Sequence, residues 1–238
     1  MEHRQATRIQ TSVLNSLERK LLVWLAARQP KWVNSDMMTF LGSFGAFLIG
    51  LGYALTSFNV NFLWLSTFGL LVNWYGDSLD GTLARYRNKQ RPVYGYYLDH
   101  TMDVVNEAMM FFGAGMAPFF DMRLTLSAFV LYLLLTINVS MNAHLRGEFK
   151  LTYFKLGPTE FRLIIIIANT LLIAIPVLTA IRHSYTLLGH SITMRILDYV
   201  AVVIITIMSL IYIVTTISDA RKYAVIDPPK KPQKTTDE

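Results

Sequence analysis

The chain has 238 residues, of which 53% are hydrophobic and only 16% are charged, and its mean hydropathy is +0.37. This composition is too apolar for an ordinary soluble domain and predicts one polytopic membrane domain. The net charge of +6 does not indicate a nucleic-acid-binding protein, because no basic, aromatic-interleaved soluble module accompanies it. The chain contains no cysteine, which excludes disulfides, thiolate metal sites and a cysteine nucleophile.

Residues 1–12 are polar and lack the apolar core of a cleavable signal, so we expect the first membrane span to act as the insertion signal. The residues that follow, up to Arg28, favour an amphipathic helix with Glu18 and its charged neighbours towards water. This helix is too short and too charged to span a bilayer. We therefore expect residues 1–36 to form a cytoplasmic N-terminus whose helix lies along the membrane interface and stops before Pro30.

Six apolar windows of the chain are long enough to cross a bilayer of about 30 Å. They cover residues 37–57, 60–80, 97–120, 124–145, 161–180 and 196–218. The sequence therefore predicts an all-α integral membrane protein with six transmembrane helices at 37–220, preceded by the interfacial amphipathic helix.

The first window contains a stripe of small residues. Gly42, Ala46 and Gly50 repeat every four residues and therefore share one face of a helix. Small residues on one face allow another helix backbone to come close. The pattern leaves open whether that helix belongs to the same chain or to a second copy.

Four aspartates lie around the junction of the second and third windows. If both segments are helical, one face of the first helix carries Asp77, Asp80, Gly81, Ala84 and Arg85. One face of the second helix carries Gly95, Asp99 and Asp103. A short loop from Arg87 to Arg91, followed by Pro92, makes the two helices antiparallel neighbours. The two carboxylate pairs are thereby predicted to meet.

Carboxylates in this position need a positive partner. One aspartate near a bilayer interior costs about 3 kcal/mol, and four of them repel one another. Two divalent cations would cancel four negative charges, and oxygen ligands select Mg²⁺ or Mn²⁺ over softer metals. The alternative is a set of solvated loop acids, but the small residues in phase with these aspartates favour a metal site.

The chain resembles the signature of the CDP-alcohol phosphotransferase family, membrane enzymes of phospholipid synthesis, in the run Asp77-x2-Asp80-Gly81-x2-Ala84-Arg85-x9-Gly95-x3-Asp99-x3-Asp103. Every fixed position of that signature is present. The resemblance implies an enzyme that moves a phosphatidyl or phospho-alcohol group from a CDP-linked donor to a hydroxyl acceptor and releases CMP.

The residues of the run suggest a role for each position in that reaction. The first three aspartates would hold two metal ions, and Asp103 would take the proton from the attacking hydroxyl while also being able to contact the metal. Gly81 and Ala84 would leave room for the nucleotide, and Arg85 would contact its phosphates. Gly95 would permit close approach from the other helix.

The basic residues predict the orientation of the chain. All but three of the 22 lysines and arginines fall on one side of the predicted spans. The exceptions are Arg123, Arg182 and Arg195. Because basic loops stay inside, both termini and the aspartates are expected to face the cytoplasm, at the inner membrane of a bacterium. The lysines and arginines on this side are expected to attract anionic lipid headgroups. We also expect the protein to form a homodimer.

A second group of polar residues follows the fourth window. Arg146, Lys150, Lys155 and Arg162 could line an anion pocket beside the metals, since guanidinium groups bind phosphate through two hydrogen bonds. The alternative is that these residues serve only to set the topology. Arg146 and Arg162 are the favoured candidates for binding the acceptor.

Two likenesses within this segment conflict on the acceptor. Ala143-His144, the stretch from Leu151 to Gly157 and Thr159-Glu160 are similar to a segment of choline/ethanolamine phosphotransferases, which use diacylglycerol. Arg146 and Glu160-x-Arg162 are similar to the acceptor-phosphate region of phosphatidylinositol-phosphate synthases. The chain also lacks the extra spans of the eukaryotic choline/ethanolamine enzymes. CDP-diacylglycerol with a phosphorylated polyol is therefore the favoured substrate pair, and a CDP-choline/ethanolamine-type reaction is the alternative.

Two other classes of protein compete with an enzyme. An ion-coupled transporter would place its acids near mid-membrane, whereas these aspartates fall near the cytoplasmic helix ends. A silent scaffold would not need all four acids.

Residues 221–238, which contain Asp227-Pro228-Pro229 and then mostly polar residues, are predicted to form a disordered cytoplasmic tail.

Overall fold

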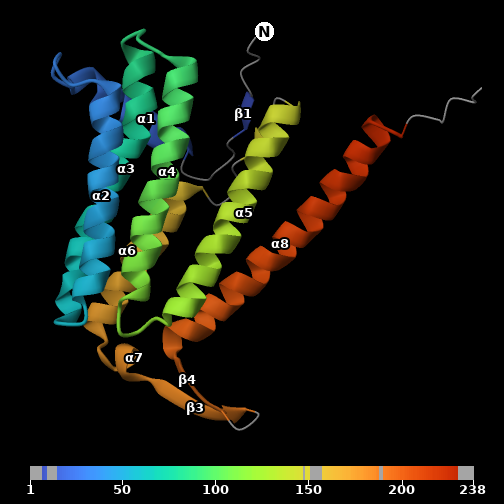
Figure 1. The fold of residues 1–238 in the computed structure, drawn as a ribbon. Coiled ribbons are helices and arrows are strands. Elements are labelled where there is room, and N and C mark those ends of the chain that lie inside the picture. The colour runs from blue at the N-terminus through green and yellow to red at the C-terminus, as the bar shows by residue number, and fades with distance from the viewer. Residues whose placement is uncertain (1–6, 10–14, 147, 151–156, 188–189, 230–238) are drawn as a thin grey trace, which may run out of the picture.

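The structure is a computed structural model that describes residues 7–9, 15–146, 148–150, 157–187 and 190–229. Most of these residues are helical (Figure 1). The helices are α1 (Asn15–Arg28), α2 (Ser35–Leu55), the short 3-10 turn η1 (Val60–Phe62), α3 (Leu63–Tyr86), α4 (Pro92–Gly115), α5 (Met122–Arg146), α6 (Pro158–Ala174), α7 (Val177–Ala180) and α8 (Ile196–Ile226). The strands are β1 (Thr7–Ile9), β2 (Glu148–Lys150), β3 (Arg182–Leu187) and β4 (His190–Arg195).

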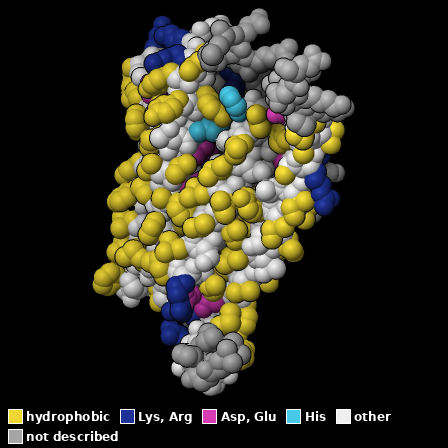
Figure 2. Space-filling view, turned by 45° about the vertical axis from the view of Figure 1, so that its right-hand side comes forward, with side chains coloured by type: hydrophobic (Ala, Val, Ile, Leu, Met, Phe, Trp, Pro, Cys, Tyr) yellow, Lys and Arg dark blue, Asp and Glu magenta, His cyan; other side chains and the backbone are white. Residues whose placement is uncertain are grey.

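Each of the six predicted windows contains a long helix, but the helices differ in how apolar they are. Among the described residues, three helices are long and apolar enough to cross a membrane: α2, α5 up to Leu145, and α8. Many large hydrophobic side chains are exposed, and they cover much of the face that Figure 2 shows. These features indicate a membrane protein. The aspartates make α3 and α4 more polar, and the 17 residues of α6 span only about 25 Å, so six spans stay a prediction.

The fifth window is interrupted. The sequence predicts one helix over residues 161–180, but α6 ends at Ala174 and a separate short helix, α7, follows. Pro176 explains the break, because proline disfavours helical geometry in the residue before it. That residue, Ile175, has φ −125° and ψ 75°, outside the helical region.

The prediction of an all-α fold is wrong in two places, because the described residues also form two small sheets. β1 pairs in parallel with β2, with Thr7 opposite Glu148. β3 and β4 form an antiparallel hairpin in which Arg182 lies opposite Arg195. β1 precedes α1, and the other three strands lie in connections between helices, where strand pairing satisfies backbone groups that no helix uses.

The two ends of the chain partly follow the prediction. α1 stops at Arg28, before Pro30 as expected, and it buries Leu22 and Ala26 while Trp24 stays half exposed. The prediction of a disordered tail from residue 221 is wrong for residues 221–226, because α8 continues to Ile226. Residues 230–238 lie outside the described part of the chain.

Close backbone packing around α2 organises the helices that carry the aspartates. A Cβ added at Gly76 of α3 would lie 2.2 Å from the backbone nitrogen of Gly42, and one added at Gly113 of α4 would lie 2.3 Å from the Cα of Gly50. Only glycine fits at such distances. The small-residue stripe of α2 thus packs within the same chain, which answers the question that the sequence left open.

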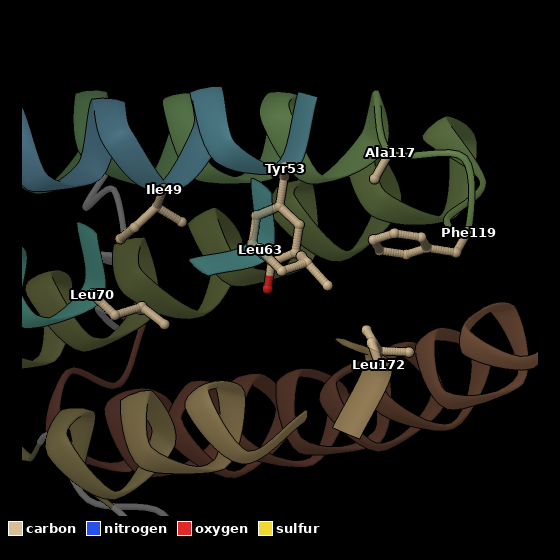
Figure 3. Close-up of a cluster of buried hydrophobic side chains, with 7 residues drawn as sticks. All are labelled: Ile49, Tyr53, Leu63, Leu70, Ala117, Phe119 and Leu172. Carbon is tan, nitrogen blue, oxygen red and sulfur yellow. The ribbon is translucent and has the colours of Figure 1, made fainter. Parts of the chain in front are cut away.

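A buried cluster joins α2, α3 and α6 at the end of the bundle opposite the α3–α4 turn (Figures 1 and 3). Its fully buried members include Leu63 and Phe119, and Leu172 reaches it from α6. The hydroxyl of Tyr53 donates a hydrogen bond to Asn169 Oδ1 at 2.8 Å. This cluster fixes α6 against α2 and α3, and therefore sets where the opposite end of α6 lies relative to the aspartates.

Candidate metal and substrate site

The four aspartates come together at one end of the bundle. Asp103 on α4 interacts electrostatically with Asp77, Asp80 and Asp99, and Asp80 interacts with Asp77 and Asp99. The gathering that the spacing predicts is therefore present in the structure, while the role of these acids as metal ligands stays a prediction. α3 and α4 run antiparallel, as expected, but each packs mainly against α2 and hardly against the other.

Asp80 is held by the start of α2. Its side chain is buried, with 9% of the residue exposed, and the hydroxyl of Thr39 donates to its Oδ2 at 2.8 Å. The backbone N–H of Gly81 donates to its Oδ1. The hydroxyl of Ser35 donates to the backbone carbonyl of Asp80 at 2.9 Å. α2 therefore orients this carboxylate as well as the helix that carries it.

Asp77 lies beside a cation from a distant part of the sequence. Arg162 on α6 donates from Nη2 to Asp77 Oδ2 at 2.6 Å and from Nε to Asn73 Oδ1 at 3.1 Å. Asn73 is buried and donates in turn to the carbonyl of Gly42 on α2 at 3.0 Å. One guanidinium thus links α6 to two neighbouring positions on a single face of α3.

Asp99 and Asp103 form a third part of the site with His100. One potential ligand atom from each of the three residues lies within 4.8 Å of the others. The His100 ring stacks on Tyr96 with the ring centroids 4.0 Å apart, and its Nδ1 lies 3.6 Å from Asp99 Oδ2. His100 was not predicted as a metal ligand, because neighbouring residues of a helix point in different directions.

The residues present fit a divalent cation. The carboxylates of Asp99 and Asp103 could offer oxygen ligands beside His100, and hard oxygen donors favour Mg²⁺ or Mn²⁺. Mutual repulsion among these acids also means that a bound cation would lower the free energy of the group. The donor chemistry therefore supports the cation prediction, with His100 as a further candidate ligand.

The residues predicted to contact the nucleotide lie near the end of α3 and the start of α4, on either side of the turn that joins these helices. A Cβ added at Gly81 would lie 3.3 Å from Arg85 Nη1, so the arginine side chain lies along the glycine face. Arg85 Nη2 also donates to the hydroxyl of Thr82 at 3.1 Å. Ala84 is half buried. A Cβ added at Gly95 would meet no atom within 4 Å, so space is open there.

The predicted acceptor residues are placed only in part. Arg162 lies within the site, as its contact with Asp77 shows. Arg146 is the last residue of α5, but its side chain lies outside the described part, as does Lys155 altogether. Glu160 is buried and accepts a hydrogen bond from the Gly157 backbone N–H at 3.0 Å, so it caps the start of α6.

Three further residues shape the site. Asn73 lies one turn before Asp77 on the same helix face, so its position could have been predicted from spacing. Thr39 and Glu18 come from other helices and left no such signal. Glu18 was expected to point towards water, but its Oε1 accepts hydrogen bonds from Trp74 Nε1 on α3 at 2.8 Å and from the Thr159 hydroxyl on α6 at 2.6 Å. That expectation is therefore wrong.

A comparison with models of known protein families finds no match to this chain, and a comparison with curated proteins finds none either. A helical bundle alone does not identify a function, because one fold supports many chemistries. The case for a function therefore depends on the residues of the site.

Proposed function

We propose that this protein is an integral membrane transferase that moves a phosphatidyl or phospho-alcohol group from a CDP-linked donor to a hydroxyl acceptor and releases CMP. The observation that carries the proposal is the meeting of four aspartates from α3 and α4 with the guanidinium of Arg162 from α6. An anionic pyrophosphate substrate needs cations to bridge it to carboxylates, and a fixed arginine can hold a further anion.

Asp77, Asp80, Asp99 and Asp103 would hold two divalent cations, with His100 within reach of the last two. When bound, Mg²⁺ or Mn²⁺ would supply positive charge to the donor pyrophosphate and to the leaving CMP. The protein's part is to orient these carboxylates. Thr39 and the Gly81 N–H do this for Asp80, and Arg162 does it for Asp77.

The remaining residues would bind substrate and move one proton. Arg85 is placed to contact the donor phosphates, and Gly81 and Ala84 leave room for the cytidine. Asp103 takes the proton from the acceptor hydroxyl as the new oxygen–phosphorus bond forms. The bond between that phosphorus and the CMP oxygen breaks, and CMP leaves with the electron pair.

For the acceptor, the position of Arg162 supports a phosphorylated polyol. Its guanidinium lies against Asp77, so an acceptor phosphate bound by Arg162 would sit beside the reacting centre. Diacylglycerol carries no anion and would not need this arginine. CDP-diacylglycerol with a phosphorylated polyol is therefore the favoured pair, and transfer from CDP-choline or CDP-ethanolamine to diacylglycerol is the second candidate.

The arrangement in the membrane follows from the same proposal. α1, the α3–α4 turn and the C-terminal end of α8 lie at one end of the bundle, and the β3–β4 hairpin lies at the other (Figure 1). Most basic residues belong to the first end. We assign that end, with the aspartates, to the cytoplasmic face of the membrane.

CMP release tests the proposal. The purified protein in lipid vesicles is incubated with CDP-diacylglycerol, CDP-choline or CDP-ethanolamine, each against inositol phosphate, glycerol phosphate and diacylglycerol, with and without Mg²⁺ or Mn²⁺. We expect CMP from CDP-diacylglycerol with a phosphorylated polyol, only when a cation is present, and at least about 100-fold less from Asp77→Asn. Absence of CMP from every pair would overturn the proposal, and full turnover in chelator would overturn the role of the cations.

A further inference from the structure

The N-terminal helix α1 reaches the site through one side chain. Glu18 Oε1 accepts hydrogen bonds from Trp74 Nε1 at 2.8 Å and from the Thr159 hydroxyl at 2.6 Å, and the Ser78 hydroxyl lies 3.5 Å away. Trp74 and Ser78 belong to α3, whereas Thr159 belongs to α6. A single carboxylate therefore bridges three helices.

The partners of Glu18 are the immediate neighbours of the Arg162–Asp77 pair. Ser78 follows Asp77 in the chain, and Thr159 lies three residues before Arg162, on the same face of α6. Glu18 and Arg162 thus connect α6 to α3 at the same level of the bundle. Arg162 makes this connection from within α6, and Glu18 makes it from α1.

α1 has other attachments that do not involve Glu18. The two residues directly after α1 are held at α3: Gln29 donates to the hydroxyl of Tyr75 at 2.5 Å, and Arg87 at the end of α3 donates to the carbonyl of Pro30 at 2.8 Å. Leu22 and Ala26 are buried in a cluster with residues of α2 and α3. Removal of the Glu18 carboxylate is therefore expected to leave α1 docked, so the contribution of Glu18 can be measured in a folded protein.

We infer that Glu18 is a positioning residue for the proposed transfer reaction, on which this inference rests. Its carboxylate holds α6 against α3 through Thr159 and Trp74, and this keeps Arg162 beside Asp77. The effect on substrate passes through Arg162, so it concerns the phosphorylated acceptor rather than the CDP-linked donor. α1 then contributes to acceptor binding through Glu18, in addition to its predicted place along the membrane interface.

The kinetic test compares Glu18→Ala with Glu18→Gln, which keeps an oxygen acceptor at the same place. We expect Glu18→Ala to raise the acceptor KM about tenfold with little change in the donor KM, and Glu18→Gln to restore most of the loss. Lys20→Ala, an exposed change on the same helix, is the matched control and should behave as wild type. If Glu18 acts through Arg162, adding Glu18→Ala to Arg162→Gln raises the acceptor KM no further.

A second measurement does not depend on activity. Because the chain has no cysteine, Phe68→Cys on α3 and Ile167→Cys on α6 can carry a pair of spin labels at two exposed positions. We expect a narrow distance distribution with Glu18 or Gln at position 18 and a broader or shifted one with Ala. An unchanged distribution in Glu18→Ala, or additive effects with Arg162→Gln, would overturn the inference. If wild type releases no CMP from any donor, the proposed function fails, while the distances still report whether Glu18 positions α6.

Discussion

Arg162 donates a hydrogen bond to Asp77 at 2.6 Å across 85 residues of sequence. Asp77 belongs to the aspartate run of α3, and Arg162 belongs to the second polar group that the sequence contains. The two side chains are only 30% and 16% exposed, so this ion pair is less screened by water than a surface pair. The contact joins the proposed donor and acceptor regions of the site directly.

The first prediction concerns the metal ligands. Asp77→Asn, Asp80→Asn and Asp99→Asn each remove one negative charge at nearly constant shape, so we expect CMP release to fall by at least about 100-fold while the protein still inserts and folds. CMP release and thermal unfolding in detergent measure the two effects. Asp36→Asn, which changes a half-buried acid in the first turn of α2 that pairs with Arg91, is the matched control and should keep near wild-type activity. If Asp36→Asn lowered CMP release as much as the other three variants, the results would not support a metal-ligand role for Asp77, Asp80 and Asp99.

The second prediction concerns the proton acceptor. Asn at position 103 cannot take a proton, so Asp103→Asn should lower kcat by about 10²- to 10⁴-fold. Donor binding, measured by equilibrium titration with CDP-diacylglycerol, should fall much less. A near wild-type kcat in this variant would move the search for the base to Glu107 or His100, both close to Asp103 in the structure.

The third prediction tests the nucleotide face of α3. Gly81→Leu would push against Arg85, whose Nη1 would lie 3.3 Å from the new Cβ, and would fill space assigned to the donor. We expect the dissociation constant for a CDP-linked donor to rise by about 100-fold or more, with insertion unaffected because leucine suits a membrane helix. Phe68→Leu, at an exposed position on the same helix, serves as control. Unchanged donor affinity in Gly81→Leu would place the nucleotide on another face.

The fourth prediction identifies the acceptor. Arg162→Gln should raise the KM for a phosphorylated acceptor about 10- to 100-fold, far more than it raises the donor KM, because the acceptor phosphate then lacks its charged partner. Arg162→Lys keeps the charge but loses the two-bond geometry, so it should be intermediate. If acceptor dependence stays flat in Arg162→Gln, the acceptor is a neutral alcohol or diacylglycerol, and His144 and Glu160 become the residues to study.

The fifth prediction concerns the packing that supports the site. Gly76→Ala places a Cβ 2.2 Å from the backbone of α2, so it should destabilise the protein by about 1–3 kcal/mol. Gly95→Ala, where the new Cβ meets nothing within 4 Å, should leave the unfolding temperature unchanged or raise it, since alanine favours helix more than glycine does. Thermal unfolding in detergent compares the two variants. Equal stability of both would contradict the close α2–α3 contact.

The sequence by itself determined the membrane class of the protein, the location of six long helices and the phase of the four aspartates. These features depend on local patterns: apolar runs of a given length, and side chains that share a face every three or four residues. The same local reasoning located the end of α1 before Pro30 and the short turn before Pro92. It did not anticipate the β3–β4 hairpin or the break at Pro176, because the apolar composition there outweighed weaker local signals.

Only the tertiary structure decided which helices meet. α2 carries no acid of the site, yet its glycines bring α3 and α4 against it and its Thr39 orients Asp80. The contacts of Arg162 with Asp77, and of Glu18 with α3 and α6, likewise join residues that are far apart in the chain. Spacing along one helix contains no information about the rotation or height of another. Those are set by close backbone packing and by the need of buried polar groups for hydrogen-bond partners, which depend on the whole fold.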